Sequence, residues 1–253
     1  MYDELADIYD RFIDWPTRLQ RELPPLLGLL GEPRAGGVPR RLADVACGTG
    51  GHSRALAEAG FAVTGFDISE PALARARAAA STLPVSFVKA GYGELAASDL
   101  GPFDIIMSLG NSLPHLTDQP RLHAAFSDFG RALAPDGLLL LGLRNLPRAI
   151  AAGERWLPPK TCVDADGSEW LIDRFYDWRS RGLIDFNIVV YRRANAGLAW
   201  QRQVHTTRLR AWPMATLLDL LADWRDVRLL ANLAGDPFDP AASGDLIITA
   251  RRP

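Results

Sequence analysis

One stretch of the chain, from Leu42 to Gly60, constrains the fold more than any other. It begins with mostly apolar residues at 41–45, turns at the sequence Gly-Thr-Gly-Gly at 48–51, and ends in an Ala- and Leu-rich segment at 53–59. A short apolar run is typical of a strand, and the segment after the turn is typical of a helix. Glycines allow the backbone to turn sharply and to approach a ligand, because they have no Cβ. The stretch therefore predicts a strand, a glycine turn and a helix.

A second short apolar segment, FAVTGFDIS, follows this helix and contains Asp67 near its end. The first turn of a helix has unpaired N–H groups, which favour a carboxylate or hydroxyl-bearing ligand. An acidic residue at the tip of the strand after a glycine turn is positioned to accept hydrogen bonds from a ribose diol. Together the two segments predict a nucleoside-binding βαβ unit.

The pattern of glycines indicates which nucleoside fits. A dinucleotide-binding turn has the form G-x-G-x-x-G, whereas this chain has Ser53 in place of the third glycine. The turn resembles instead the E/D-x-A/G-x-G-x-G loop of class I methyltransferases that use S-adenosylmethionine (SAM), matched by Asp44, Ala46, Gly48 and Gly50. A glycine turn that serves only to reverse the chain is the alternative, and Asp67 argues against it.

Strands and helices continue to alternate after Asp67. A helix follows Ser69, which is a typical N-cap residue, and a strand is predicted within VSFVKAGYGEL. Further along, a strand at 104–109, a helix at 119–133 and a fully apolar strand at 138–143 are predicted. Such alternation predicts an α/β fold with a Rossmann-like, doubly wound, mostly parallel sheet and helices on both of its faces.

The alternation breaks after residue 145. Strand-like runs at 169–178, 183–192 and 200–209 are separated by turn signals and predict an antiparallel β insertion after strand five, which would cover the active site. A helix at 214–224 and a strand at 245–250 complete the chain.

These elements predict a single domain over residues 1–253 with three parts. Leucines and aromatic residues recur at three- and four-residue intervals in the first part of the chain, which predicts an N-terminal helical cap at 1–32. The SAM-binding, Rossmann-like core is predicted at 40–145 and 206–253, and the substrate-covering insertion at 146–205.

Composition narrows the classes of protein. Hydrophobic residues make up 48% of the chain and the formal net charge is −2, with no block of lysine and arginine, so we expect no nucleic-acid partner. We find no run of about 18 apolar residues and no signal-peptide pattern, so we expect no membrane association. Cys47 and Cys162 are too few for a disulfide framework, which suits a cytoplasmic location. A homo-oligomer remains open.

Three blocks of sequence resemble the glycine N-methyltransferase family and its glycine/sarcosine relatives. They are LADVACGTGGHSRALAEAGFAVTGFDIS, FDIIMSLGNSLPHL and LAPDGLLLLGLRN, and the family reads DVACGTG, CLGNSxxHL and PGGLLVxDHRN at these places. The resemblance implies SAM as cofactor and S-adenosyl-L-homocysteine as product. In the family, an arginine at the position of Arg18 pairs with the methionine carboxylate, and residues at Gly91 and Tyr92 surround the adenine. The cofactor-binding residues implied are Tyr9, Arg18, Ala46, Gly48, Gly50, Asp67, Ile68, Gly91, Tyr92, Leu109 and His115.

The resemblance also implies a site for the methyl acceptor. Asn111 and Arg144 occupy the positions of the family's substrate groups, and together with His115 they are the predicted catalytic residues. Tyr176, Trp178 and Trp212 are candidate substrate-binding aromatics. Without the resemblance, Asn111 reads equally well as a turn residue and Arg144 as part of a salt bridge. Where the family has Asp-His-Arg-Asn-Tyr-Asp, this chain has Gly-Leu-Arg-Asn-Leu-Pro at 142–147, which favours an acceptor larger or less polar than glycine.

The leading prediction is a SAM-dependent methyltransferase that transfers a methyl group to a small molecule by in-line displacement, at an amine or amino-acid nitrogen. The alternatives are a small-molecule O-methyltransferase and a non-catalytic SAM- or nucleoside-binding regulatory protein. No metal site is predicted, because His52, His123 and His205 lack metal-ligand spacing and are expected on the surface of helices or strands. The acceptor, the use of a general base, the oligomeric state and the pathway stay open.

Overall fold

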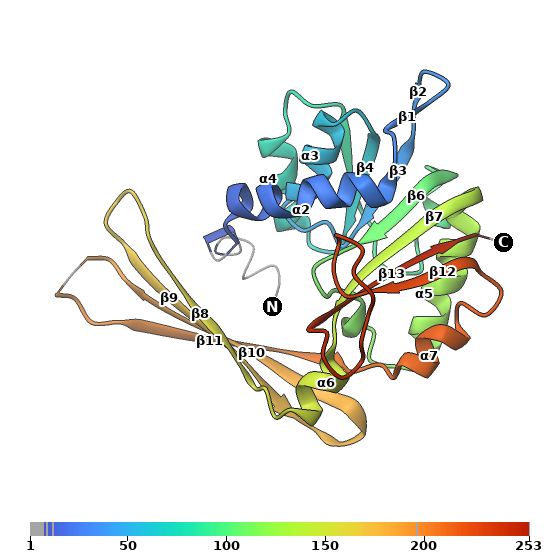
Figure 1. Cartoon of the computed structure of the whole chain (residues 1–253). Helices are drawn as coiled ribbons and strands as arrows, with labels where there is room; N and C mark the ends of the chain where they lie inside the picture. The colour runs from blue at the N-terminus through green and yellow to red at the C-terminus, as the bar shows by residue number, and fades with distance from the viewer. Residues whose placement is uncertain (1–7, 9, 12, 196, 253) are drawn as a thin grey trace.

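The chain folds around one large twisted sheet with a second sheet beside it (Figure 1). The computed structural model describes residues 8, 10, 11, 13–195 and 197–252. A two-stranded hairpin of β1 (Arg34–Ala35) and β2 (Val38–Pro39) projects from the large sheet. Within the described residues, no helix is long and apolar enough to cross a membrane.

The large sheet has seven strands in the order β12-β13-β7-β6-β3-β4-β5. Strands β5, β4, β3, β6 and β7 are parallel, and β13 lies antiparallel between β7 and β12. The strand order reverses beside β3, where α/β sheets open a crevice at the carboxyl ends of their strands. The bounds are β3 (Arg41–Val45), β4 (Ala62–Asp67), β5 (Val85–Lys89), β6 (Phe103–Ser108), β7 (Leu133–Arg144), β12 (Arg225–Leu230) and β13 (Asp245–Arg251). The predicted doubly wound α/β fold is confirmed.

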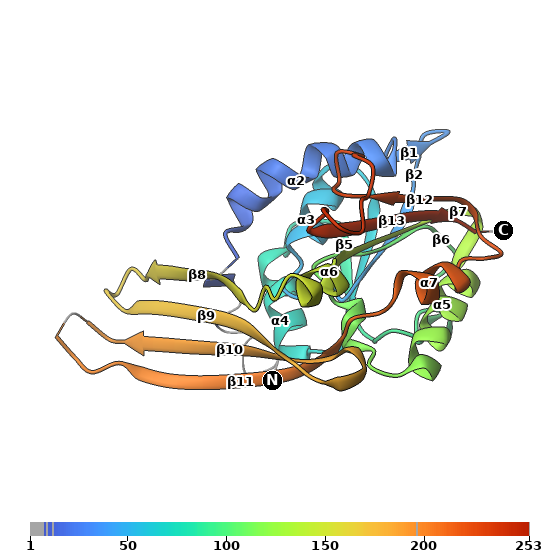
Figure 2. The ribbon, with the colours of Figure 1, turned by 60° about the horizontal axis from the view of Figure 1, so that its bottom comes forward.

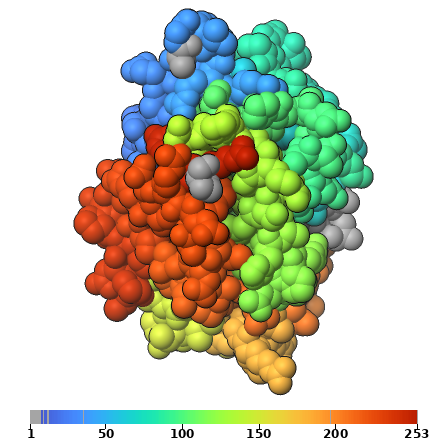
Figure 3. Space-filling view, turned by 90° about the vertical axis from the view of Figure 1, so that its right-hand side faces the viewer, coloured from blue at the N-terminus to red at the C-terminus, as the bar shows by residue number. Residues whose placement is uncertain are grey.

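Helices cover both faces of this sheet. On one face lie α2 (Trp15–Leu30), α3 (Gly51–Glu58) and α4 (Glu70–Ala79), whose apolar residues pack on β3, β4 and β5. On the other lie α5 (Gln119–Ala132) and α7 (Met214–Asp219), joined by Trp212 in one buried cluster. Figure 3 shows the orange and red C-terminal segment beside the green region of α5. The sheet is therefore buried on both sides, as its apolar strands require.

The second sheet is the predicted antiparallel insertion. It has the order β11-β10-β9-β8 and extends away from the large sheet (Figures 1 and 2). Its strands are β8 (Trp156–Val163), β9 (Glu169–Trp178), β10 (Leu183–Arg193) and β11 (Gln201–Arg210), preceded by α6 (Leu146–Ala151). The bounds predicted for β9 agree with the structure, those for β10 differ by one residue at one end, and those for β11 differ by one residue at each end.

Four of the elements differ clearly from the sequence prediction. Strand β8 was not predicted because Pro158 and Pro159 interrupt its pattern, and it tolerates them because it lies at the edge of its sheet. Strand β12 was missed because arginine and aspartate dominate its sequence. The predicted helix at 214–224 ends instead at Asp219, and the strand predicted at 138–143 begins earlier, at Leu133.

The contact between α2 and α3 depends on the absence of a side chain at Gly51. A Cβ at this position would lie 2.3 Å from the ring of Trp15. We therefore expect Gly51→Ala to lower the free energy of unfolding by about 1–3 kcal/mol, since a packed interface must shift to accept the methyl group. Urea denaturation measures this change.

Gly28 provides a matched control on the exposed side of α2, where an added Cβ meets nothing within 4 Å. Gly28→Ala should be neutral or should stabilise the protein by up to about 1 kcal/mol, because alanine favours a helix interior. Equal denaturation midpoints for the two variants would contradict the close packing of Gly51 on Trp15.

Candidate functional site

A cavity of about 1080 Å³ opens at the carboxyl ends of the parallel strands. Its walls come from the tips of β3, β4, β6, β7 and β13, from α2, and from one face of the second sheet. Figure 2 shows the second sheet running past these strand ends. Pockets for one drug-sized ligand measure about 300–1,000 Å³, so this cavity has room for two small molecules at once.

The glycine turn forms the floor of the cavity. Ala46, Gly48 and Gly50 all have a positive φ, of 61°, 57° and 75°, so the backbone turns sharply after β3. The Asp67 carboxylate accepts hydrogen bonds from the backbone N–H of Gly48 at 2.8 Å and of Ser69 at 2.9 Å. A carboxylate has about four lone-pair positions, so Asp67 can still accept hydrogen bonds from a ligand hydroxyl.

A buried hydrogen bond supports the turn from behind. Ser53, which replaces the third glycine of a dinucleotide motif, donates from its hydroxyl to Asp44 at 2.5 Å. Burial raises the pKa of Asp44 to about 6. The bond joins the end of β3 to the first turn of α3. Cys47 is also buried here, and burial raises the pKa of its thiol, as expected for a packing residue and not for a nucleophile.

The wall beside the turn is a charged cluster on α2. Glu22 accepts hydrogen bonds from Arg18 Nε at 2.9 Å and lies 3.0 Å from His52 Nε2, and the Arg18 guanidinium lies over the Trp15 ring. His52 was predicted on a surface, but it is only 6% exposed because α2 covers the start of α3. Burial favours the neutral acid, but the hydrogen bond to His52 and the charge of Arg18 outweigh it and lower the pKa of Glu22 to about 2.

The opposite side of the turn is partly apolar. Ile68 is 66% exposed although it is a large hydrophobic residue, and it lines the cavity. Gly91 packs against it, because a Cβ there would lie 2.9 Å from Ile68 Cγ2, and the Gly91 N–H donates to Glu94 at 2.7 Å. The hydroxyl of Tyr92 lies 2.6 Å from that of Ser108, so its polar end is bound to the protein.

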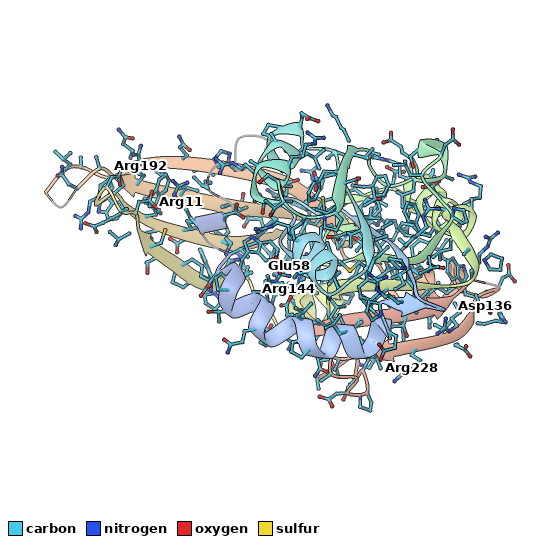
Figure 4. All side chains as sticks on the ribbon, turned by 90° about the horizontal axis from the view of Figure 1, so that it is seen from above. Arg11, Glu58, Asp136, Arg144, Arg192 and Arg228 are labelled. Carbon is cyan, nitrogen blue, oxygen red and sulfur yellow. The ribbon has the colours of Figure 1, made fainter. Side chains whose placement is uncertain are left out.

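The far end of the cavity lies at the tips of β6, β7 and β13. Asn111 has a φ of 66°, and its side-chain oxygen accepts a hydrogen bond from the Arg144 N–H at 3.0 Å. Burial raises the pKa of Tyr176, and the nearby charge of Arg144 opposes this shift. Asp245 is the register partner of Arg144 across β7 and β13. In Figure 4, Arg144 lies in the central region of the molecule where these elements meet.

His115 lies in η2 (Leu113–His115), between the large sheet and the insertion. Its Nδ1 is 3.5 Å from the Thr207 hydroxyl of β11. Burial lowers the pKa of His115 to about 4, so the imidazole is neutral at physiological pH.

Most of the predicted site residues line this one cavity, although their roles stay predictions. They are Arg18, Ala46, Gly48, Asp67, Ile68, Gly91, Tyr92, Leu109, Asn111, His115, Arg144 and Tyr176. Tyr9 lies outside the described residues. The contacts of Asn111 also agree with its alternative as a turn residue, because its amide oxygen joins the tips of β6 and β7.

Three predicted residues do not line the cavity. Gly50 lies beneath the turn, where a Cβ would meet the Phe87 ring at 2.8 Å. Trp178 stacks on Tyr176 with ring centroids 5.3 Å apart and is thus one layer further out. Trp212 is buried and donates from its indole N–H to the Leu116 carbonyl at 2.9 Å, so it joins the insertion to the core.

Sequence reasoning missed several charged residues of the cavity. These are Arg21, Glu22, Glu94, Arg121, Arg174 and Asp245. The acid in the glycine-rich loop GYGEL was a signal for Glu94. The others have no local signal, because a charged residue on a helix or at the end of a strand is usually a solvated one.

The low pKa of Glu22 predicts how stability depends on pH. Its folded pKa of about 2 lies below the ordinary value of 4.5, so its contribution is complete above that value and is lost as the pH falls toward 2. We expect Glu22→Gln to destabilise the protein at neutral pH on the order of 1–3 kcal/mol. We also expect the variant to lose less stability than the wild type between about pH 5 and pH 3.

Urea denaturation at several pH values measures both effects. Glu58→Gln is the matched control, since Glu58 is an exposed carboxylate at the end of α3 (Figure 4). The wild type should lose stability more steeply than Glu22→Gln as the pH falls. If it did not, the ionised, hydrogen-bonded state of Glu22 would be contradicted.

Comparison with known proteins agrees with this geometry. Residues 42–137 match the family model of a methyltransferase domain. The chain is 36% identical over 155 residues to a glycine/sarcosine N-methyltransferase of Parasynechococcus marenigrum (strain WH8102), which covers 60% of this chain and 53% of that protein. A ubiquinone biosynthesis O-methyltransferase of Caulobacter (strain K31) is 31% identical over 48% of this chain and 50% of its own. The chain thus spans about half the length of these relatives.

Two further likenesses extend along nearly the whole chain. The YqeM protein of Bacillus subtilis (strain 168) is 29% identical over 87% of this chain and 84% of its own. The structure of a SAM-bound amino pentose methyltransferase from Micromonospora echinaspora covers 98% of this chain and 95% of its own, with a TM-score of 0.71 and 20% identity, which shows a shared fold. Residues 42–137 thus match a methyltransferase domain, the fold is that of SAM-dependent methyltransferases, and the sequence resembles the glycine/sarcosine N-methyltransferases.

Proposed function

We propose that this protein transfers a methyl group from SAM to a small-molecule acceptor, and that the accepting atom is nitrogen. One observation carries the proposal: a single cavity of about 1080 Å³ joins the glycine turn of a methyltransferase domain to a separate polar end at Arg144. Donor and acceptor can therefore be held side by side, as a direct transfer requires.

The residues around the turn fit the chemistry of SAM. Asp67 can accept hydrogen bonds from the ribose hydroxyls, and the exposed side chain of Ile68 offers an apolar surface to the adenine. The contact of Arg18 with Glu22 uses Nε, so the other N–H groups of the guanidinium can bind the planar methionine carboxylate. Gly91 leaves room beside Ile68 that a larger residue would fill.

When bound, SAM supplies a methyl group that is already activated by its sulfonium. The protein's own contribution is therefore alignment of the acceptor and exclusion of water, which can lower a barrier by about 7–11 kcal/mol when the geometry is good. The second sheet lines one side of the cavity, and its apolar residues Leu157, Phe186 and Leu209 contribute to the exclusion of water.

The state of His115 favours nitrogen over oxygen as the acceptor. A hydroxyl acceptor must lose its proton to a base, and burial lowers the pKa of His115 to about 4, which makes it a weak base. An amine that arrives neutral needs only a free lone pair. O-methylation is the alternative, since an O-methyltransferase is among the similar proteins.

Two measurements test this function. Calorimetric titration with SAM and S-adenosylhomocysteine should show binding of both, and mass spectrometry of a panel of amines, amino acids and phenols should detect a product heavier by one methylene. Methylated phenols without methylated amines would overturn the assignment to nitrogen. Binding without turnover of any acceptor would favour a regulatory protein instead.

The role of Asp67 can be tested by removing its charge. We expect Asp67→Asn to weaken binding of S-adenosylhomocysteine about 10- to 100-fold, since hydrogen bonds to a charged group contribute about 1.5–3 kcal/mol. Calorimetry measures the affinity, and thermal unfolding checks the turn, because Asp67 also bonds Gly48. Unchanged affinity would rule out the ribose role. Asp173→Asn on the second sheet is the matched control.

Substitution of Arg144 distinguishes acceptor binding from cofactor binding. We expect Arg144→Gln to raise the KM of the acceptor about 10-fold or more while changing the affinity for S-adenosylhomocysteine less than 2-fold, because Arg144 lies near Tyr176 at the acceptor end. Steady-state kinetics and calorimetry measure the two quantities. Equal losses in both would indicate damage to the fold and would contradict an acceptor role.

A further inference from the structure

We propose that the acceptor is an amine with an apolar body larger than that of glycine. Its nitrogen binds at Asp245, and its apolar body lies against the cavity-facing side of the second sheet. This inference rests on the proposed function, and it assigns a specificity-determining role to Asp245 that the sequence did not suggest.

The carboxylates of the cavity differ in how they are bonded. Asp67 accepts from two backbone N–H groups, Glu94 accepts from Gly91, and Glu22 is bonded by Arg18 and His52. Asp245 also lines the cavity, and among the described residues no side chain or backbone group donates a hydrogen bond to its carboxylate. A carboxylate that only accepts hydrogen bonds and lines a cavity is suited to a donor that comes with the ligand.

The position of Asp245 along β13 places it at the acceptor end. Ile247 pairs with Gly142 in the register, and a Cβ at Gly142 would lie 2.7 Å from Leu109. Asp245 pairs with Arg144, two residues further along both strands. Two residues along a strand span roughly 7 Å. Asp245 therefore lies roughly 7 Å further along β13 than Ile247, whose partner Gly142 is beside Leu109.

The surroundings of Asp245 favour a neutral amine, which donates an N–H hydrogen bond and keeps its lone pair free for the methyl group. Burial raises its pKa and the charge of Arg144 lowers it, with the net direction upward. Asp245 is an exposed residue at the start of β13 and lines the cavity, so an incoming amine can reach its carboxylate. The charge of Arg144 acts on both Asp245 and Tyr176, so the amine site and Arg144 are adjacent.

The wall facing this end is mostly apolar, although Arg174 and Thr207 also belong to it. The four-stranded sheet contributes four apolar side chains to the cavity. They lie on one face of the sheet, and they are Leu157, Phe186, Ile188 and Leu209. The rings of Tyr176 and Phe186 lie 5.2 Å apart and continue this surface. Glycine has no side chain to bury against such a wall, whereas an alkyl or aromatic amine gains affinity with every methylene that it buries.

A series of primary amines tests the apolar wall. With the wild-type protein and saturating SAM, we expect kcat/KM to rise about fourfold per added methylene from ethylamine to hexylamine, and glycine to be a poor acceptor. Ile188→Ala should flatten this dependence, and Val204→Ala, on an exposed position of β11, should leave it unchanged. Glycine methylated more efficiently than every longer amine would overturn the inference.

Substitution of Asp245 tests the amine site. We expect Asp245→Asn to raise the KM for hexylamine about 10-fold or more, and Asp245→Glu to restore part of the loss, with affinity for S-adenosylhomocysteine within 2-fold of wild type. Asp226→Asn, an exposed carboxylate of the adjacent strand β12, should have no effect on either quantity. An unchanged KM for Asp245→Asn would overturn the role of Asp245.

The proposed function and the inference about the acceptor can be told apart by their outcomes. If the wild type bound no S-adenosylhomocysteine, the proposed function would itself be wrong. If it bound S-adenosylhomocysteine and methylated an amine, but neither chain length nor Asp245 affected the rate, then the function would stand and the inference about the acceptor would be overturned.

Discussion

The carboxylate of Asp67 holds the SAM-binding half of the molecule together. It accepts one hydrogen bond from Gly48, in the turn after β3, and one from Ser69, at the start of α4. A single side chain therefore fixes two backbone segments at the carboxyl edge of the sheet, where the strand order reverses and a crevice forms. The left-handed backbone of the turn is tolerated because it is made of small residues and is anchored in this way. The cavity floor, and hence the position of every other wall, depends on this anchor.

The second sheet is tied at one end to the core and further out to the N-terminal segment, so it is held as one wall of the cavity. Near the core, Trp212 and Arg210 donate to the carbonyls of Leu116 and Thr117, which follow directly on η2. Further out, Arg11 forms an ion pair with Asp164 at 3.0 Å, so the N-terminal part of the described chain joins the insertion (Figure 4). Such contacts connect segments that lie far apart in the sequence. They give the acceptor end a rigid wall, which a water-excluding transfer site needs.

Much of the fold could be predicted because its signals are local. The glycine turn, Asp67 and the alternation of β9, β10 and β11 each depend on residue spacing within one element. Strands β8 and β12 escaped prediction because an edge position tolerates prolines and charges that a central strand would exclude. Tyr176, Trp178 and Trp212 were predicted together as substrate-binding aromatics, but only Tyr176 lines the cavity, since sequence does not tell which aromatic residue reaches a cavity and which packs behind it.

By itself the sequence determined the fold class and the end of the sheet at which a ligand binds, because periodicity and glycine spacing restrict the backbone directly. Only the tertiary structure decided that His52 is buried against Glu22, that Asn111 joins the tips of two strands, and that Asp245 lies opposite Arg144. These residues come from different elements, and their neighbours depend on the strand order and on helix packing. No local pattern records that order, so the electrostatic character of the acceptor end emerged only when the sheet was assembled.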